Sequence, residues 1–581
     1  MSTNLHSAWA ALFLRALVQS GVRDLVISPG SRSTPLCLAA AQTEGLRTHT
    51  HVDERVAAFF ALGIARATGA PTALLCTSGT AGAHWLPAVI EAAQAHHPLV
   101  LLTADRPWEA YDCAAPQTID QTDLFGRYVR HRAELGLPDP DPGALRAVVR
   151  IAAQSVHAAR WPTPGPVHVN ARFRKPLEPV AVDGPEAWAP LVQSLCAARI
   201  YAPSRTVPDG AAEALAAAIA RHPHGVVSCG PGDGAVFHHA RALAERAGYP
   251  LLAEATSGVR FAPDSPPDAL DLALRSRRFR AAHAPTLRIE LGLPPTAASY
   301  ASWLAEHPTT ERWVIAPHGW PDPQGDATTR VFADDALLAA VLDRLPARAP
   351  DAWLADFALA STLALSRARR ERDDDALHEL NVAADLVDAL DDGDVLVAGN
   401  SMPVRDLDVF AHRAAALRVV HQRGASGIDG TVAGAAGLRA VSDPARRVAV
   451  LLGDITLLHD LGGLNAARGA TAPLVIVAVQ NDGGRIFAQL PLGRQGAEGP
   501  LAQAFQAHFI TAQGVHFEGA AAMFGVAYRR VETRADYREA LREALTHPGA
   551  TLLEAVVPGE DATRRRAAVT RDVCAELDAR W

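Results

Sequence analysis

The chain has 581 residues, enough for roughly three to four domains of ordinary size. Hydrophobic residues make up 49 % of the chain and charged residues 20 %, which is the composition of a globular protein. With a net charge of −8 and no basic run, nothing indicates nucleic-acid binding, and no apolar run is long enough to cross a bilayer.

Cysteine usage and the N-terminal segment indicate the compartment. The six cysteines are scattered and form no CxxC pair, so neither a zinc site nor a disulfide framework is expected. Residues 5–22 are amphipathic and lack the basic start and the cleavage site of a signal peptide. We therefore expect reduced thiols and a cytoplasmic protein without a membrane partner.

Three predicted strands near the N-terminus end in polar or glycine-rich turns. After a helix at 9–18, strands at 25–27, 73–76 and 99–102 are followed by SPGSRSTP, TSGTA and TADRP. The motif HVDER precedes an apolar helix and puts Glu54 at its start. This pattern is typical of a doubly wound α/β domain, where ligands bind beyond the strand ends. Read singly, the motifs also fit structural turns, and Glu54 fits an acid favoured by the helix dipole.

The middle of the chain is less informative. Residues 112–121 are loop-like, a strand at 167–170 closes the first sheet, and the Pro- and Ala-rich stretch 179–208 is predicted to be a linker. Strands at 226–228, 251–252, 287–289 and 313–315 predict a second α/β unit. The glycine-rich run at 230–234 is interpreted as a turn, and the charge run at 367–375 as a solvated helix face or linker.

The last third again alternates strands with polar turns. Strands at 395–397 and 419–420 precede GNSMPVR and HQRGASGIDG, and a final strand lies at 552–556. Between them, the strand 448–452 ends in Gly453-Asp454, a helix follows, and the strand 474–479 ends in QNDGG. These two strands and their helix form a βαβ unit with parallel strands.

Asp454 and Asn481 both fall at carboxyl ends of these parallel strands, 27 positions apart. A hard divalent cation takes oxygen ligands, here a carboxylate and an amide oxygen, and the carbonyl of Gly483 offers a third. Gly453 allows the backbone to approach a diphosphate. An ordinary sheet with polar strand ends is the alternative for the Gly-Asp dipeptide alone.

The motifs SPGSRSTPL, HVDER, TSGTA, LLTADRP, GNSMPVR and RGASGIDG, together with the Gly-Asp…Asn pair, resemble one family closely. It is the 2-succinyl-5-enolpyruvyl-6-hydroxy-3-cyclohexene-1-carboxylate (SEPHCHC) synthase family of thiamin diphosphate (ThDP) enzymes. The resemblance implies an α/β protein of three consecutive doubly wound parallel-sheet domains. These are a pyrimidine-binding domain at 1–185, a central nucleotide-fold domain at 205–350 and a diphosphate-binding domain at 375–581.

The resemblance also implies an activity and partners. The family decarboxylates 2-oxoglutarate with ThDP and adds the resulting succinyl-semialdehyde carbanion to isochorismate, in menaquinone biosynthesis. The implied cofactors are ThDP and Mg²⁺ or Mn²⁺. The implied assembly is a homodimer or homotetramer with active sites at the subunit interface.

Matched motif positions carry the implied roles. Glu54 is the activating acid of the cofactor's aminopyrimidine, and Ile428 is the apolar residue that bends the cofactor. The implied cofactor contacts are Thr80, Asn400, Ser401, Arg423, Ser426, Gly427, Gly453 and Ile455, and the implied metal ligands are Asp454, Asn481 and Gly483. Arg405 and Arg423 are assigned to 2-oxoglutarate, and Arg32, Arg106 and Gln117 to isochorismate, because arginine binds carboxylates in a bidentate manner. Ser401 is included among the catalytic residues, and the implied apolar wall consists of Ile486, Phe487 and Leu490.

Two positions depart from the family pattern. Ile455 stands where most of the superfamily has a glycine. Residues 291–299 contain neither Lys nor Arg, although family members carry a basic pair in the corresponding segment. The rival interpretations are another ThDP-dependent 2-oxoacid decarboxylase or carboligase, which needs fewer carboxylate-binding arginines, and a catalytically inactive ThDP-fold binding protein, which would not need Glu54.

Overall fold

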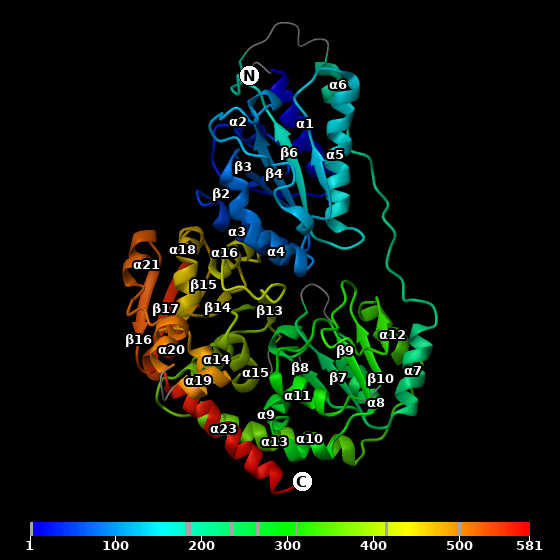
Figure 1. Cartoon of the computed structure of the whole chain (residues 1–581), viewed down its shortest axis with the longest axis vertical. Coiled ribbons are helices and arrows are strands. Elements are labelled where there is room, and N and C mark those ends of the chain that lie inside the picture. Colours follow the sequence, from blue (N-terminus) through cyan, green and yellow to red (C-terminus); the bar gives the residue numbers. More distant parts are fainter. Residues whose placement is uncertain are drawn as a thin grey trace. The chain divides into compact units, whose positions relative to one another are not determined.

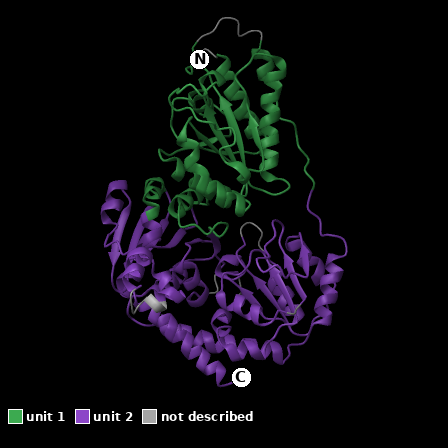
Figure 2. Cartoon of the chain, viewed as in Figure 1, with its two compact units in different colours: residues 1–203, 422–443, 459–470 green, residues 204–421, 444–458, 471–581 purple. Residues whose placement is uncertain are grey.

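The computed structural model describes residues 4–180, 188–232, 237–262, 268–308, 311–412, 416–496 and 501–581. The chain divides into two compact units (Figure 2). Unit 1 contains Met1–Pro203, Gln422–Asp443 and His459–Ala470, and unit 2 contains Ser204–His421, Pro444–Leu458 and Thr471–Trp581. Among the described residues, no helix has the length and apolar character needed to cross a membrane.

Unit 1 is built on one six-stranded parallel sheet with the order β2-β1-β3-β4-β6-β5 (Figure 1). The strands are β1 (Asp24–Ile27), β2 (Arg47–Thr50), β3 (Thr72–Cys76), β4 (Leu99–Asp105), β5 (Arg132–Glu134) and β6 (Pro166–Arg172). The helices are α1 (Leu5–Gln19), α2 (Thr34–Ala40), α3 (Glu54–Thr68), α4 (Leu86–Gln94), α5 (Pro142–Arg160), α6 (Ala189–Ser194), α16 (Thr431–Val441) and α18 (Leu461–Ala467). The central strands β3, β4 and β6 are fully buried, as parallel strands covered on both faces require.

Unit 2 contains two parallel sheets, and the first is five-stranded, with the order β11-β10-β9-β7-β8. Its strands are β7 (Gly225–Cys229), β8 (Leu251–Ala253), β9 (Leu287–Leu291), β10 (Glu311–Ile315) and β11 (Thr329–Val331). The helices of this part are α7 (Ala211–Arg221), α8 (Ala240–Ala247), α9 (Leu270–Ala273), α10 (Arg277–Ala282), α11 (Ala298–Glu306), α12 (Asp335–Leu342) and α13 (Ala352–Arg372).

The second sheet of unit 2 has six strands in the order β13-β12-β14-β15-β17-β16. Its strands are β12 (Val395–Ala398), β13 (Arg418–His421), β14 (Val448–Gly453), β15 (Leu474–Gln480), β16 (Ala527–Val531) and β17 (Ala550–Val556). The helices are α14 (Glu379–Ala389), α15 (Met402–Phe410), α17 (Asp454–His459), α19 (Pro491–Gly496), α20 (Ala502–Phe505), α21 (Glu518–Phe524), α22 (Arg534–Ala544) and α23 (Asp561–Asp578). In chain order, this sheet has the same strand sequence as the sheet of unit 1, although no sequence repeat marks the similarity.

The prediction of three parallel α/β sheets is confirmed, and several details are corrected. The predicted linker at 179–208 contains the helix α6, and β4 runs three residues beyond Leu102, to Asp105. The single helix predicted between β14 and β15 is two helices, α17 and α18, with the break at Asp460. The charge run at 367–375 includes the end of α13, and part of the run at 230–234 lies outside the described residues. The domain bounds 1–185, 205–350 and 375–581 stay a prediction.

Candidate active site

In unit 1, the turns after β1 and β3 lie at the point where the strand order reverses. In doubly wound sheets, ligands bind beyond the strand ends at this point. The two turns are packed together, because a Cβ on Gly30 would lie 2.2 Å from Cβ of Thr77. The backbone N–H of Arg32 donates to Thr77 Oγ1 at 3.2 Å. Glycine at position 30 therefore allows the backbone of Arg32 to lie against the end of β3.

Arg32 and Arg106 bring two positive charges to this strand-end region. Arg32 is 5 % exposed, and its guanidinium donates to the carbonyl of Phe173 at 2.6 Å. Burial lowers the pKa of Arg32, and the nearby charge of Arg106 lowers it further. The Nε atoms of both arginines are buried without a hydrogen-bond partner, and neither side chain has a carboxylate partner among the described residues. The charge of Asp105 offsets this effect only in part, so the two like charges favour an anionic ligand.

A buried polar network supports the loop that carries Arg106 and Gln117. The guanidinium of Arg172 donates to the carbonyl of Arg106 at 3.0 Å and lies over the Trp108 ring at 3.5 Å. Gln121 accepts from the N–H of Gly79 at 2.8 Å and donates to Asn170 at 3.1 Å. Sequence reasoning missed Asn170 and Arg172, because both lie on β6, which the sequence indicates only as core.

Gln117 and Thr80 lie close to this network. Gln117 is exposed and has a φ of 53°, and its Cα would lie 3.5 Å from a Cβ on Gly79. Gly79 itself has a φ of 88° and precedes the 3₁₀ turn that begins at Thr80. A side chain at position 79 would be strained, so the glycine keeps the turn after β3 open beside Gln117.

Glu54 is the first residue of α3, as predicted. The side chain of Asp53 caps the helix by accepting from the N–H groups of Arg55 and Val56. The Glu54 carboxyl is half-buried and close to the end of β3: burial raises the pKa of the Cys76 thiol, and the Glu54 charge raises it further. Capping by Asp53 leaves the Glu54 carboxyl available for a ligand.

The segment 422–430 also belongs to unit 1, so Arg423, Ser426, Gly427 and Ile428 share a compact unit with Glu54. Glu91 anchors it by accepting from the N–H groups of Gly424 and Ala425, at 3.1 and 2.6 Å. Ser426 has a φ of 61°, a conformation that side chains rarely adopt. Arg423 and Ile428 are half-buried, and Ser426 is exposed.

The helix α16, which follows this segment, packs closely on α3. A Cβ on Gly63 would lie 1.9 Å from the carbonyl oxygen of Gly434, and one on Gly437 would lie 1.9 Å from that of Phe60. Only glycine permits this approach of the two backbones. Asp460, at the break between α17 and α18, accepts from the N–H groups of Val432 and Ala433 at 2.8 and 2.9 Å and so caps α16.

In unit 2, the second set of predicted residues lies where the order of the six-stranded sheet reverses, after β12 and β14. Asn400 is buried beyond β12, and Ser401 has a φ of 70° with ψ of −128°, a strained backbone of the kind found at ligand sites. Within the described part of the chain, no heavy atom outside its immediate neighbours lies within 4 Å of a Cβ built on Gly453, which leaves open space beside the end of β14.

Asp454 and Asn481 are joined through the backbone of Gly483. Asp454 is 6 % exposed and accepts from the N–H groups of Ile455 and Gly483, both at 2.8 Å. Burial raises the pKa of Asp454 to about 6. The amide of Asn481 donates to Glu379 at 2.6 Å, and its Oδ1 is buried without a partner among the described residues. A buried carboxylate beside an orphaned amide oxygen fits a divalent cation.

A cavity of about 780 Å³ in unit 2 contains Arg405. The guanidinium of Arg405 donates to the carbonyl of Ser401 at 2.6 Å and has no carboxylate partner among the described residues. Ala488 and Gln489 line the cavity, but the predicted wall residues Ile486, Phe487 and Leu490 are not among its lining residues. Phe487 packs edge-on against Phe509, and Leu490 is 46 % exposed.

The segment without Lys or Arg lines the same cavity, and arginines of other segments supply positive charge there. Arg275 pairs with Asp271 at 2.7 Å and donates to Thr570 at 2.9 Å. Arg571, on α23, is 73 % exposed, and its nearest acid partner, Asp572, is 3.8 Å away. The cavity therefore carries charge at Arg405 and Arg571 that close ion pairs do not neutralise.

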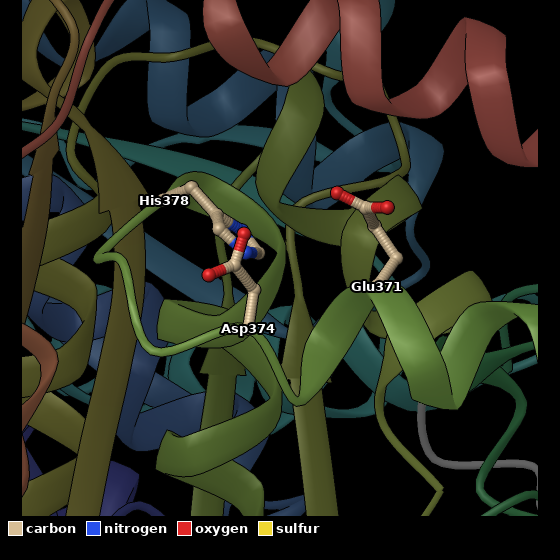
Figure 3. Close-up of side chains that lie close together, drawn as sticks. All are labelled: Glu371, Asp374 and His378. Carbon is tan, nitrogen blue, oxygen red and sulfur yellow. The ribbon is translucent and has the colours of Figure 1, made fainter.

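Glu371, Asp374 and His378 form a second group of possible metal ligands (Figure 3). Arg565 already pairs with both carboxylates, and the His378 ring accepts from the N–H of Asn381 at the start of α14. Through these contacts the cluster connects α13, α14 and α23, so its side chains are satisfied without a metal ion.

Comparison with known families gives two matches. Residues 8–124 match the N-terminal TPP (thiamine pyrophosphate) binding domain of thiamine pyrophosphate enzymes, and residues 406–555 match the C-terminal TPP binding domain.

Individual relatives and a solved structure agree. A 2-succinyl-5-enolpyruvyl-6-hydroxy-3-cyclohexene-1-carboxylate synthase from Sorangium cellulosum (strain So ce56) is 50 % identical, covering 99 % of this chain and 97 % of the relative. The synthase of the same name from Myxococcus xanthus (strain DK1622) is 41 % identical over 93 % of each chain. The crystal structure of benzoylformate decarboxylase from Polynucleobacter necessarius aligns with a TM-score of 0.71 at 15 % identity, covering 96 % of this chain and 99 % of that one, which supports the fold.

Proposed function

This chain belongs to the SEPHCHC synthase family of ThDP-dependent enzymes, and we propose how its own residues carry out the family reaction. It is a ThDP-dependent transferase that decarboxylates 2-oxoglutarate and adds the remaining four-carbon unit to isochorismate, giving SEPHCHC and carbon dioxide in menaquinone biosynthesis. Bound ThDP supplies the carbanion centre and the electron sink for this chemistry.

The proposed substrate assignment rests mainly on Arg32 and Arg106. Both substrates carry two carboxylates, and a bidentate guanidinium is the best protein partner of a carboxylate. The two arginines repel one another and Asp105 offsets this only in part, so an incoming dianion relieves the repulsion. An acceptor with a single carboxylate would leave much of this charge unpaired.

The cofactor is held in two parts. Asp454, Asn481 and the carbonyl of Gly483 would hold Mg²⁺ or Mn²⁺, which suits the orphaned Asn481 Oδ1. Glu54 would share a proton with N1′ of the aminopyrimidine and so promote removal of the C2 proton. The other proposed cofactor contacts are Thr80, Asn400, Ser401, Arg423, Ser426, Gly427, Ile428, Gly453 and Ile455.

The arginines divide between the two substrates. Arg405 and Arg423 would bind 2-oxoglutarate, while Arg32, Arg106 and Gln117 would bind isochorismate, with Ile486, Phe487 and Leu490 as an apolar wall. We further propose that Arg275 and Arg571 take the place of the family's basic pair, because both line the cavity that contains Arg405 and residues 296–299. The replacement preserves positive charge beside a segment that has none of its own.

The assembly is part of the proposal. The protein would act as a homodimer or homotetramer in which Glu54 of one subunit and Asp454 of another serve the same cofactor. The described cysteines are all free thiols, which supports the cytoplasm as its compartment.

The test is an incubation of the protein with ThDP, Mg²⁺ and isochorismate, together with either 2-oxoglutarate or pyruvate. Mass spectrometry should detect SEPHCHC only with 2-oxoglutarate. Pyruvate turnover without 2-oxoglutarate turnover would contradict the substrate assignment. If isochorismate stays intact in both reactions, it is not the acceptor substrate, and the proposal is contradicted.

A further inference from the structure

The C-terminal helix α23 places one arginine between two buried carboxylates. The Arg566 side chain is 10 % exposed, and those of Glu379 and Asp406 are 2 % and 5 % exposed. Nε of Arg566 donates to Asp406 Oδ1 at 2.8 Å, and its terminal nitrogen contacts both Asp406 Oδ2 and Glu379 Oε2. Arg566 therefore fixes the start of α14 and the helix α15 at one point.

Glu379 connects this ion pair to Asn481. One of its carboxylate oxygens contacts Arg566, and the other accepts from the Asn481 amide nitrogen at 2.6 Å. A carboxylate accepts but does not donate, so the NH₂ group of Asn481 must face Glu379. The Asn481 oxygen then faces away from Glu379, and this is the buried Oδ1 that has no partner among the described residues.

We propose that Arg566 is a positioning residue for the divalent metal ion. It holds Glu379, Glu379 holds the amide of Asn481, and the amide presents its oxygen to the ion. This inference rests on the proposed role of Asp454 and Asn481 as metal ligands. Partners that orient a metal ligand through a hydrogen bond typically contribute roughly 10- to 100-fold to metal affinity.

The charge balance supports the same conclusion. Glu379, Asp406 and Asp454 are three buried carboxylates, and Arg566 pairs with the first two. Without Arg566, Glu379 and Asp406 would face one another unpaired in a buried site.

The test compares Arg566→Lys with Arg565→Lys. A lysine keeps the charge but lacks the planar fork that contacts two carboxylates at once. Arg565 is the adjacent residue on α23 and also joins two acidic residues, Glu371 and Asp374, but it does not contact Glu379. Mn²⁺ binding is followed by electron paramagnetic resonance in saturating ThDP, and thermal unfolding of the apo-protein reports the fold.

Arg566→Lys should raise the Kd for Mn²⁺ by roughly 10- to 100-fold, and Arg565→Lys should leave it within about threefold of the parent. At saturating Mn²⁺, the Arg566→Lys enzyme should regain most of its kcat. Equal Mn²⁺ affinities of the two variants would overturn the inference.

If Arg566→Lys fails to fold, Glu379→Gln tests the same series of contacts at Glu379, which lies between Arg566 and Asn481. It should also weaken Mn²⁺ binding, because a glutamine no longer fixes which end of the Asn481 amide faces it, and unchanged affinity would again overturn the inference.

Asp454→Ala separates this inference from the proposed function. Loss of Mn²⁺ binding in Asp454→Ala together with parental affinity in Arg566→Lys would refute the positioning role alone. Parental affinity in Asp454→Ala would refute the proposed metal site, and the positioning role with it.

Discussion

The N–H of Gly483 donates to Asp454 Oδ2 at 2.8 Å and so joins the ends of two neighbouring parallel strands. Asp454 follows β14, and Gly483 lies three residues beyond the last residue of β15. Two residues before Gly483, Asn481 has a buried side-chain oxygen without a partner among the described residues. The proposed metal site is thus largely arranged before an ion binds.

Replacement of Asp454 by alanine should abolish metal-dependent ThDP binding, because it removes the only charged ligand of the proposed set. The measurement is calorimetric titration of ThDP with and without Mg²⁺. In the parent, Mg²⁺ should strengthen binding, and in Asp454→Ala it should have no effect. Equal ThDP affinity of parent and variant in Mg²⁺ would remove Asp454 from the ligand set.

Arg106→Gln should lower the activity of the protein without lowering its stability. Loss of a charge-assisted contact weakens binding by roughly 1.5–3 kcal/mol, so kcat/KM for isochorismate should fall about 10- to 100-fold. The substitution also removes repulsion from Arg32, so the apo-protein should unfold at the same or a higher temperature. Arg127→Gln, an exposed position in the same unit, serves as the control and should change neither quantity. A large loss of stability with unchanged kcat/KM would contradict an anion-binding role for Arg106.

Asp460 makes stability depend on pH. Burial raises its pKa to about 7, from a usual value of 3.8. The folded protein therefore binds this proton more tightly than the unfolded chain, and the contribution of Asp460 to stability decreases as the pH rises from about 4 to about 7.

Asp460→Asn keeps an oxygen that accepts from Val432 and Ala433 but does not titrate. The free energy of unfolding of the variant minus that of the parent should increase from pH 4 to pH 8, by at most about 4 kcal/mol. Urea unfolding at both pH values measures the difference. A stability difference that stays constant with pH would show that Asp460 is not responsible.

Arg571→Gln should raise KM for isochorismate, because it removes one of the two charges proposed to replace the family's basic pair beside residues 296–299. The expected increase is about 3- to 10-fold, since the side chain is exposed and its interactions are screened. Arg564→Gln removes a similarly exposed arginine of α23 that does not line the cavity, and it should leave KM unchanged. Equal KM values for the two variants would exclude Arg571 from substrate binding.

Strands that contain an apolar run could be predicted, and these include the edge strands β8 and β13, whereas the edge strands β2, β5 and β16 could not. β2 has the sequence RTHT, β5 has RAE, and β16 has AYRRV, and each has exposed residues. Such strands carry no apolar pattern, and tertiary pairing alone makes them strands. The break between α17 and α18 was missed for a different reason, because the apolar spacing continues across Asp460.

The strand-end residues of the candidate site could be predicted because each lies in a local motif. The residues that position these side chains could not be predicted, because they are distant from them in the sequence. Glu379 and Asn481 are 102 positions apart, and Glu379 and Arg566 are 187 apart. The sequence also gives no sign that segment 422–430 packs with the first unit, since that depends on the close contact of Gly63 with Gly434.

The central claim is that Glu54 of one subunit and Asp454 of another serve one cofactor, and mixing two inactive variants tests it most directly. Glu54→Gln and Asp454→Ala are purified separately, mixed in equal amounts, dissociated and reassociated, and SEPHCHC formation is measured. Random exchange in a dimer gives half heterodimers with one intact site of two, so activity should return to about a quarter of the parent value. If subunit exchange is verified by mass spectrometry and the mixture stays inactive, each site is formed within one chain and the claim is contradicted.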